Sequence, residues 1–215
     1  MLVEFFINNH YTDQEAKDIL KNLKDNHCVD SVLIDANYLR LAKYFFDTKK
    51  INLYVDYPLG NMSSKLRLEQ VKANTNSSGI VSIQAPSYAL VNRKYDKIRK
   101  EIEAIKTNVD KDVNIRYIID YRKFNHNILC KFCSILEEFE LSTIYASTGF
   151  FVDNVYDHIL AIQYLTKKSK IKCILNANIW TKDHVDLIMS TDIAGLSVQH
   201  LHVLSMINTC NDSRK

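Results

Sequence analysis

The feature of this sequence that most constrains its fold is a regular alternation between short apolar runs and longer amphipathic runs. The apolar runs are rich in Val, Ile, Phe and Tyr and do not alternate cleanly with polar residues, which is typical of parallel strands buried on both faces. They are Leu2–Ile7, Ser31–Asp35, Ile51–Asp56, Gly79–Ala85, Val113–Asp120, Ser142–Ser147, Ile171–Ala177 and Ile193–Val198. We therefore predict an α/β chain with a parallel sheet.

The amphipathic runs carry apolar residues at helical spacing. Thr12 and Glu15 form a capping box, which predicts a helix over Thr12–Asn26. A second helix is expected from Ser63 or Ser64 to Ala73, and a long one from Asn92 to about Lys106. The later helices are expected to begin near Asn125, Asp153, Thr181 and Gln199.

Eight strand–helix units in 215 residues, roughly 27 residues each, predict a single closed (β/α)8 TIM barrel. A doubly wound open sheet is the alternative. Such sheets usually have about five or six strands, however, and no glycine-rich dinucleotide turn follows the first strand here. With only 4 Gly and 2 Pro there is no flexible linker. We expect the barrel over residues 1–208 and a short tail over 209–215.

The composition argues against several function classes. A net charge of +3 without a basic stripe argues against nucleic acid as a partner. No apolar stretch approaches the roughly 20 residues of a membrane span, and no secretory signal is expected. The five cysteines show no disulfide framework, which favours a cytoplasmic location. Cys130 and Cys133 lack a second pair at zinc spacing, so we expect no metal and no other cofactor.

In such barrels, functional residues lie at the carboxyl ends of the strands. The segment Ser147–Phe150 stands at one such end, and its hydroxyl groups and glycine before a helix predict an anion site. A plain strand-to-helix turn is the alternative interpretation. Asp35, Asp56 and Asp120 also end strands, where a carboxylate cluster could bind Mg²⁺, although helix capping and loop solvation explain them more simply.

Two segments carry a resemblance to a known family. Asp56–Gly60 reads Asp-Tyr-Pro-Leu-Gly and resembles the Phe-Pro-Leu-Gly segment of deoxyribose-phosphate aldolases, including the helix that follows it and ends at Gln70–Ala73. Tyr145–Phe150 reads Tyr-Ala-Ser-Thr-Gly-Phe and resembles the Lys-Thr-Ser-Thr-Gly-Phe signature of that family. Order, spacing and strand context agree over nearly the whole chain, from about Val3 to Leu204.

The resemblance implies a class I aldolase barrel, an enzyme that cleaves 2-deoxyribose 5-phosphate to glyceraldehyde 3-phosphate and acetaldehyde. That reaction needs a lysine, because only a primary amine forms the iminium that accepts electrons as the carbon–carbon bond breaks. When the motifs of the family are aligned with this sequence, the Schiff-base lysine falls on Tyr145. The second lysine of the family, which lowers the pKa of the Schiff-base lysine, falls on Ile174. The relay aspartate of the fourth strand falls on Ser82, and the aspartate of the first strand falls near Val3, beside Glu4.

Two hypotheses of function follow. In the first, the chain has lost aldolase activity and is retained for binding, either of a protein partner, including a second copy of itself, or of a sugar phosphate. The resemblance then implies weak sugar-phosphate binding through Ser147, Thr148, Gly149, Asn178 and Ser197.

In the second hypothesis, the chain is an active deoxyribose-phosphate aldolase that uses a displaced lysine. Lys172 is the strongest candidate, because it lies two residues before Ile174 and shares its strand face. An open pocket with a lysine inside is expected in that case. Under the first hypothesis, large side chains such as Tyr145, Tyr88 and Trp180 are expected to close the mouth of the barrel.

Overall fold

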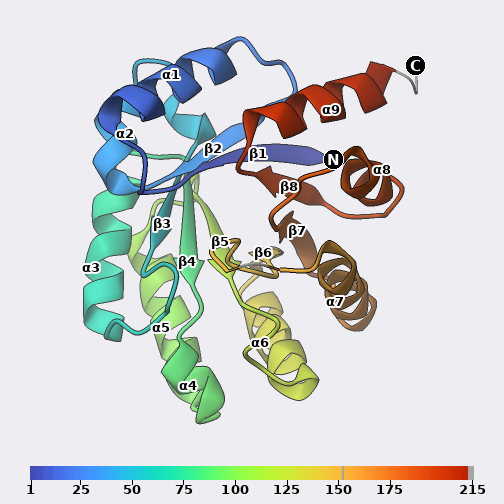
Figure 1. Ribbon diagram of the computed structural model, residues 1–215. Helices are drawn as coiled ribbons and strands as arrows, with labels where there is room; N and C mark the ends of the chain where they lie inside the picture. Colours follow the sequence, from blue (N-terminus) through green and yellow to red (C-terminus); the bar gives the residue numbers. More distant parts are fainter. Residues whose placement is uncertain (152, 213–215) are drawn as a thin grey trace.

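Eight parallel strands form a closed barrel in the computed structural model, which describes residues 1–151 and 153–212 (Figure 1). Each strand pairs with the next along the chain, and β1 pairs with β8. The strands are β1 (Leu2–Ile7), β2 (Ser31–Ile34), β3 (Ile51–Val55), β4 (Ile80–Gln84), β5 (Asn114–Ile118), β6 (Thr143–Tyr145), β7 (Lys172–Asn176) and β8 (Gly195–Val198). The prediction of a (β/α)8 barrel is confirmed.

Helices follow the strands and lie outside the barrel (Figure 1). The longer helices are α1 (Asp13–Lys24), α3 (Ser64–Thr75), α5 (Tyr95–Asn108), α6 (His126–Glu138), α7 (Val155–Lys168), α8 (Lys182–Met189) and α9 (Leu201–Asp212). The short ones are η1 (Ala36–Tyr38), α2 (Leu39–Ala42), η2 (Thr48–Lys50) and α4 (Ser87–Val91). The side chains of Thr12, Ser63, Asn125 and Thr181 cap their helices as predicted, each accepting a hydrogen bond from a backbone N–H of the first turn.

Two helix starts differ from the prediction. Asn92 does not begin a long helix; it ends α4, and Arg93 then takes a positive φ of 53° before α5 begins. Asn154, not Asp153, caps α7, because its Oδ1 accepts hydrogen bonds from the first backbone N–H groups of that helix.

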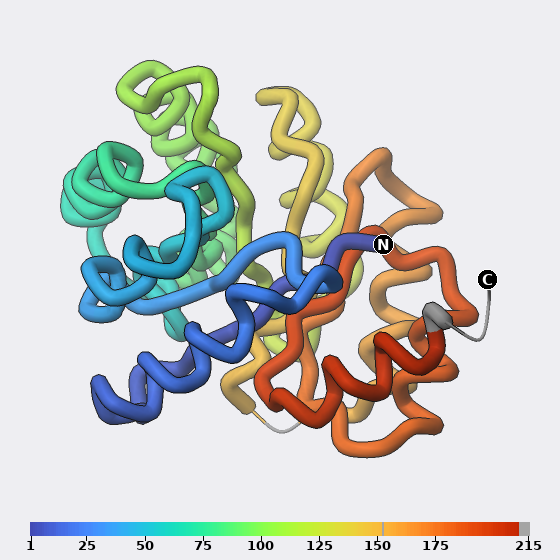
Figure 2. The backbone as a smooth tube through the Cα atoms, turned by 90° about the horizontal axis from the view of Figure 1, so that it is seen from above, coloured from blue at the N-terminus to red at the C-terminus, as the bar shows by residue number. Residues whose placement is uncertain are grey.

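The last helix also differs from the prediction. It begins at Leu201 rather than Gln199 and continues to Asp212, so residues 209–212 of the expected tail are helical. Residues 213–215 of that tail lie outside the described part of the chain. Figure 2 shows the N-terminal strand beside the last segments of the chain, where β1 and β8 close the barrel. No helix among the described residues is long and apolar enough to cross a membrane.

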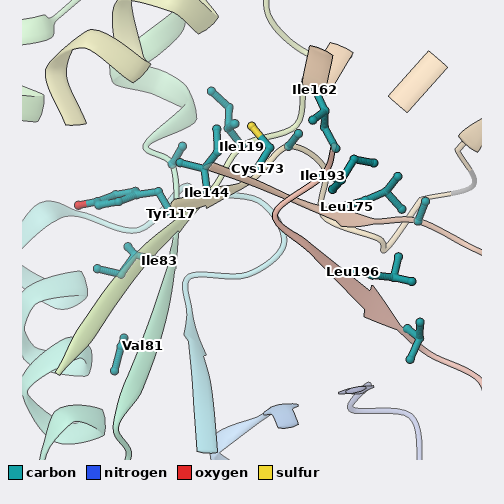
Figure 3. Close-up of a cluster of buried hydrophobic side chains, with 14 of the residues drawn as sticks. Val81, Ile83, Tyr117, Ile119, Ile144, Ile162, Cys173, Leu175, Ile193 and Leu196 are labelled. Carbon is teal, nitrogen blue, oxygen red and sulfur yellow. The ribbon is translucent and has the colours of Figure 1, made fainter. Parts of the chain in front are cut away.

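Side chains along each strand alternate between two environments. The outward set packs against the helices; Figure 3 shows it in Val81, Ile83, Tyr117, Ile144, Cys173 and Leu196, with Ile162 of α7. The inward set forms a separate apolar cluster of Phe6, Leu33, Tyr54, Ile118, Tyr145 and Ile174. Because both strand faces are buried, the apolar runs show no clean alternation with polar residues.

Candidate functional site

A layer of polar side chains fills the inside of the barrel. It takes one residue from each of six successive strands, β1 to β6, and each of these residues is at most 4% exposed. The six are Glu4, Ser31, Asn52, Ser82, Arg116 and Tyr145. Polar groups this deep destabilise a fold unless they are hydrogen-bonded, so the contacts among them decide what the layer can do.

Glu4 is the centre of this layer. Its Oε2 accepts hydrogen bonds from Ser31 Oγ at 2.8 Å and Asn52 Nδ2 at 2.9 Å, and it forms an ion pair with Arg116 Nη1 at 3.3 Å. Its Oε1 accepts a hydrogen bond from the Tyr145 hydroxyl at 2.5 Å. Both carboxylate oxygens are therefore occupied by side chains of β2, β3, β5 and β6.

Tyr145 stands where the resemblance expects the Schiff-base lysine. Its hydroxyl donates to Glu4 and accepts from Asn52 Nδ2 at 2.8 Å and from Arg116 Nη1 at 3.0 Å. One proton and two lone pairs are all that a hydroxyl offers, so this group is saturated. Burial raises the pKa of Tyr145, and the Glu4 carboxylate raises it further, so the phenol remains protonated.

Lysine amines are missing from this layer. Among the described residues no lysine is buried: all are exposed except Lys131, which is half-buried on α6. Lys172 is the first residue of β7 and exposed, so it lies at the end of the barrel opposite the carboxyl ends of the strands. The structure thus brings Tyr145 and Ile174 together in the inner cluster and leaves Lys172 outside it.

The remaining positions of the expected catalytic set also face inward. On β1 the inward residue is Glu4, while Val3 packs in the outer layer. On β4 the inward residue is Ser82, whose hydroxyl donates to Asn52 Oδ1 at 2.9 Å. The four positions that the resemblance assigns to catalysis therefore face the barrel interior, and a glutamate, a serine, a tyrosine and an isoleucine occupy them.

The segment Ser147–Phe150 closes the carboxyl end of the barrel. The Thr148 carbonyl accepts hydrogen bonds from the Tyr57 hydroxyl at 2.9 Å and from Asn176 Nδ2 at 2.8 Å. The Gly149 carbonyl accepts one from Gln199 Nε2 at 2.8 Å. Groups that follow or end β3, β7 and β8 thus hold this loop. Gly149 has a φ of 67°, and a Cβ there would lie 2.3 Å from Asn176 Oδ1, so the loop needs glycine at this point.

The predicted ligand-binding residues lie at this closed end. Ser147, Thr148 and Ser197 are fully buried, and Asn178 is half-buried. The Ser147 and Thr148 hydroxyls accept hydrogen bonds within the turn, from Gly149 N at 3.3 Å and Phe150 N at 3.2 Å. The Ser197 hydroxyl has no hydrogen-bond partner among the described residues.

The side chains expected to close the mouth were wrongly chosen. Tyr88 is 61% exposed and Trp180 is 55% exposed, while Tyr145 lies deep in the polar layer. Tyr57 closes the mouth instead: besides its bond to the loop, its ring contacts that of Phe150 at a centroid distance of 6.2 Å.

The three strand-end aspartates do not form a cation site. Asp56 pairs with the fully buried Arg67 at 3.0 Å, and Asp120 pairs with Arg122 at 2.9 Å. Arg67 also pairs with Glu101 at 3.0 Å. No group of three or more His, Cys, Asp or Glu in the part of the chain that the structure describes could hold a metal ion.

Sequence reasoning missed Asn52 and Arg116. Each is a polar residue within an apolar run, at the same strand phase as the inward residue two positions later, Tyr54 or Ile118. That phase was the available signal, since a strand has a period of two. An isolated polar residue at an inward position of a barrel strand therefore predicts a buried polar contact.

Comparisons with known proteins support the fold. No family model matches the chain. The deoxyribose-phosphate aldolase of Clostridium novyi (strain NT) is 24% identical over 142 residues, which cover 65% of this chain and 64% of that protein, less than two thirds of its length.

Solved structures extend the likeness to the whole barrel. A deoxyribose phosphate aldolase from Aeropyrum pernix, described as tetrameric, superposes with a TM-score of 0.76 at 8% identity, over 99% of this chain and 90% of that one. A candidate deoxyribose-phosphate aldolase from Coccidioides immitis gives a TM-score of 0.81 at 12% identity, over 100% and 85%. In sequence and in fold, this chain is therefore similar to the deoxyribose-phosphate aldolases.

Proposed function

We propose that this chain is a cytoplasmic, aldolase-like barrel without Schiff-base aldolase activity, which binds a small phosphorylated sugar at the carboxyl end of its strands. The observation that carries the proposal is the absence of a buried lysine among the described residues, together with the saturated Tyr145 hydroxyl at the expected lysine position.

The chemical argument concerns the amine. A Schiff base requires an unprotonated primary amine next to the carbonyl carbon of the substrate. A phenol cannot form an imine, and the Tyr145 hydroxyl has no lone pair left to accept another partner. Lys172 is exposed at the other end of the barrel, away from the carboxyl ends of the strands.

The support for a phosphate ligand comes from β8 and the helix after it. Ser197 carries a buried hydroxyl without a partner among the described residues, and it is the third residue of β8, the strand that leads into the 12-residue helix α9. Helix N-termini attract anions, because their first backbone N–H groups point outward and are unpaired. Opening of the Ser147–Phe150 loop would expose this hydroxyl to a ligand.

Borohydride trapping tests the loss of activity. The protein is incubated with 2-deoxyribose 5-phosphate or acetaldehyde, reduced with borohydride, and its intact mass is measured. We expect no mass increase, beside a clear adduct on the aldolase of Clostridium novyi treated in parallel. An adduct that peptide mapping locates on any lysine of this chain would refute the proposal.

Calorimetric titration tests the ligand. We expect 2-deoxyribose 5-phosphate to bind and Ser197→Ala to weaken that binding at least about ten-fold, since a hydrogen bond to a charged group contributes about 1.5–3 kcal/mol. Ser205→Ala, at an exposed position of α9, is the matched control and should bind like the parent chain. Equal affinities of the Ser197 variant and the parent would remove Ser197 from the site.

A second candidate function is protein association through the mouth of the barrel. Phe150, Phe151 and Trp180 lie in the loops after β6 and β7, and they are 51%, 39% and 55% exposed. Exposed apolar groups gathered at one end of a monomer favour an interface. Sedimentation velocity would test this as a homodimer: Trp180→Ser should shift the chain toward monomer, and a parent chain that is monomeric at high concentration would exclude the homodimer.

A further inference from the structure

A pocket opens between the loops that follow β2 and β3. Its volume is about 310 Å³, and its lining includes Asp35, Tyr54, Asp56, Tyr57, Met62 and Gln70. It shares no residue with the Ser147–Phe150 loop or with α9. A cavity of this size holds a small molecule, so the question is which chemistry its lining recognises.

The pocket contains a polar group that lacks a partner. Tyr54 is only 7% exposed, and its hydroxyl makes no hydrogen bond within the residues that the structure describes. Burial raises the pKa of Tyr54, and the nearby Asp35 carboxylate raises it further, so this hydroxyl stays neutral. Buried polar atoms without a partner are uncommon because each loses its hydration without compensation. A ligand that donates a hydrogen bond to the Tyr54 oxygen would compensate this one.

The charge of the lining is negative. Asp56 forms an ion pair with Arg67 at 3.0 Å, and Arg67 forms a second ion pair with Glu101 at 3.0 Å. The two carboxylates thus share one guanidinium, and together the three side chains carry more negative than positive charge. Asp35 has no cation beside it in the lining, and no lysine or arginine lines the pocket. Its Oδ1 accepts the capping hydrogen bond from Asn37 N at 2.8 Å, and its carboxylate lies close to the Tyr54 hydroxyl. These charges repel a phosphate and attract a cation.

The walls of the pocket suit an organic cation. The rings of Tyr54 and Tyr57 lie 4.7 Å apart, and Met62 adds an apolar surface. Aromatic rings attract cations through the negative charge on their faces. We propose that this pocket binds a small organic amine as its ammonium ion, which donates hydrogen bonds to the Asp35 carboxylate and the Tyr54 hydroxyl oxygen while its carbon chain contacts Tyr57 and Met62. The pocket shares no lining residue with the sugar-phosphate site proposed above, although Tyr57 also holds the Ser147–Phe150 loop through the Thr148 carbonyl.

Two probes of the same shape test the charge. Isopentylamine is an ammonium ion at neutral pH, and isopentanol replaces that group by a neutral hydroxyl. Each is titrated into the isotope-labelled chain while the amide resonances are followed by NMR. We expect saturable shifts with the amine and an affinity for the alcohol at least about ten-fold lower, because the charged hydrogen bond is lost. Equal affinity for both probes, or no saturable shift with the amine, overturns the proposal.

Three variants locate the site. Asp35→Asn removes the charge but keeps the cap of η1, since asparagine caps as well as aspartate; it should weaken amine binding at least about ten-fold. Tyr54→Phe deletes a hydroxyl without a partner, so the fold should hold while amine binding weakens about three- to ten-fold. Asp47→Asn is the matched control, because Asp47 caps η2 through Lys49 N at the same 2.8 Å and lies outside the pocket lining.

The control should bind the amine like the parent chain. If Asp35→Asn does not fold, the Tyr54 variant decides alone. Parent-like amine binding in that variant would show that the hydroxyl is not a ligand and overturn the assignment. Equal weakening in the Asp47 variant would show a general effect of surface charge, which overturns it as well.

Discussion

Replacement of Tyr145 by phenylalanine removes one oxygen from the middle of the barrel and keeps the ring. Three hydrogen bonds disappear with it: to Glu4 at 2.5 Å, from Asn52 at 2.8 Å and from Arg116 at 3.0 Å. The two with Glu4 and Arg116 involve a charged group and are the stronger ones. No cavity is created beyond the volume of one oxygen atom, so the expected loss comes from the hydrogen bonds.

The size of the loss follows from what each partner keeps. Glu4 keeps its contacts with Ser31, Asn52 and Arg116, all three of which donate to its Oε2. No charge is left wholly unpaired, so the loss should be smaller than the 3–5 kcal/mol typical of a broken buried ion pair. We expect Tyr145→Phe to lower the free energy of unfolding by about 2–4 kcal/mol.

Urea unfolding, followed by circular dichroism, measures this loss. Tyr117→Phe is the matched control: Tyr117 is also fully buried, but its hydroxyl has no hydrogen-bond partner among the described residues. That variant should stay within about 0.5 kcal/mol of the parent chain or exceed it, because it removes a buried oxygen without compensation. Similar losses in both variants would refute the view that the polar layer, and not the ring, is what stabilises this position.

Three further changes have defined outcomes. Gly60→Ala should lower the free energy of unfolding by at least about 2 kcal/mol, because Gly60 has a φ of 68° and a Cβ there would lie 2.1 Å from the Ala85 carbonyl oxygen; urea unfolding measures it. Arg67→Met leaves Asp56 and a second buried carboxylate without their cation, and about 3–5 kcal/mol should be lost in the same assay. Burial lowers the pKa of His158 to about 3, so below an unfolded-state pKa of about 6.5 the unfolded chain binds the extra proton. Stability should therefore fall by about 2 kcal/mol between pH 6.5 and 5, and His158→Gln should flatten that dependence; an unchanged slope would contradict the shift.

The fold could be predicted from the sequence because its signals are local. The strands follow from apolar runs, and the caps at Thr12 and Thr181 follow from single side chains next to helical spacing. The break between α4 and α5 could not be predicted, since helical spacing runs through it and the positive φ of Arg93 has no sequence signature. Non-glycine residues take that conformation only where the surrounding structure imposes it.

The candidate site could be predicted only as a set of positions. The alignment named Tyr145 and Ile174, and both face the barrel interior. What Tyr145 does there depends on Glu4, which lies 141 residues away in the chain, and on Arg116 from a third strand. Such contacts depend on how the barrel closes, which no local pattern contains. The contact of Tyr57 could not be predicted for the same reason, because its partner Thr148 is 91 residues away.

The polar layer has a consequence for how the barrel selects its strand register. Side chains alternate along a strand, so a slip of β1 by one residue would replace Glu4 with Val3 or Phe5 on the inner face and turn the carboxylate toward the helices. Asn52, Arg116 and Tyr145 would then lose their common acceptor inside the barrel. An apolar interior would tolerate such a slip much better, because one aliphatic contact replaces another. The polar layer thus acts mainly by destabilising barrels in which a strand is paired out of register, and less by stabilising the barrel with the correct register.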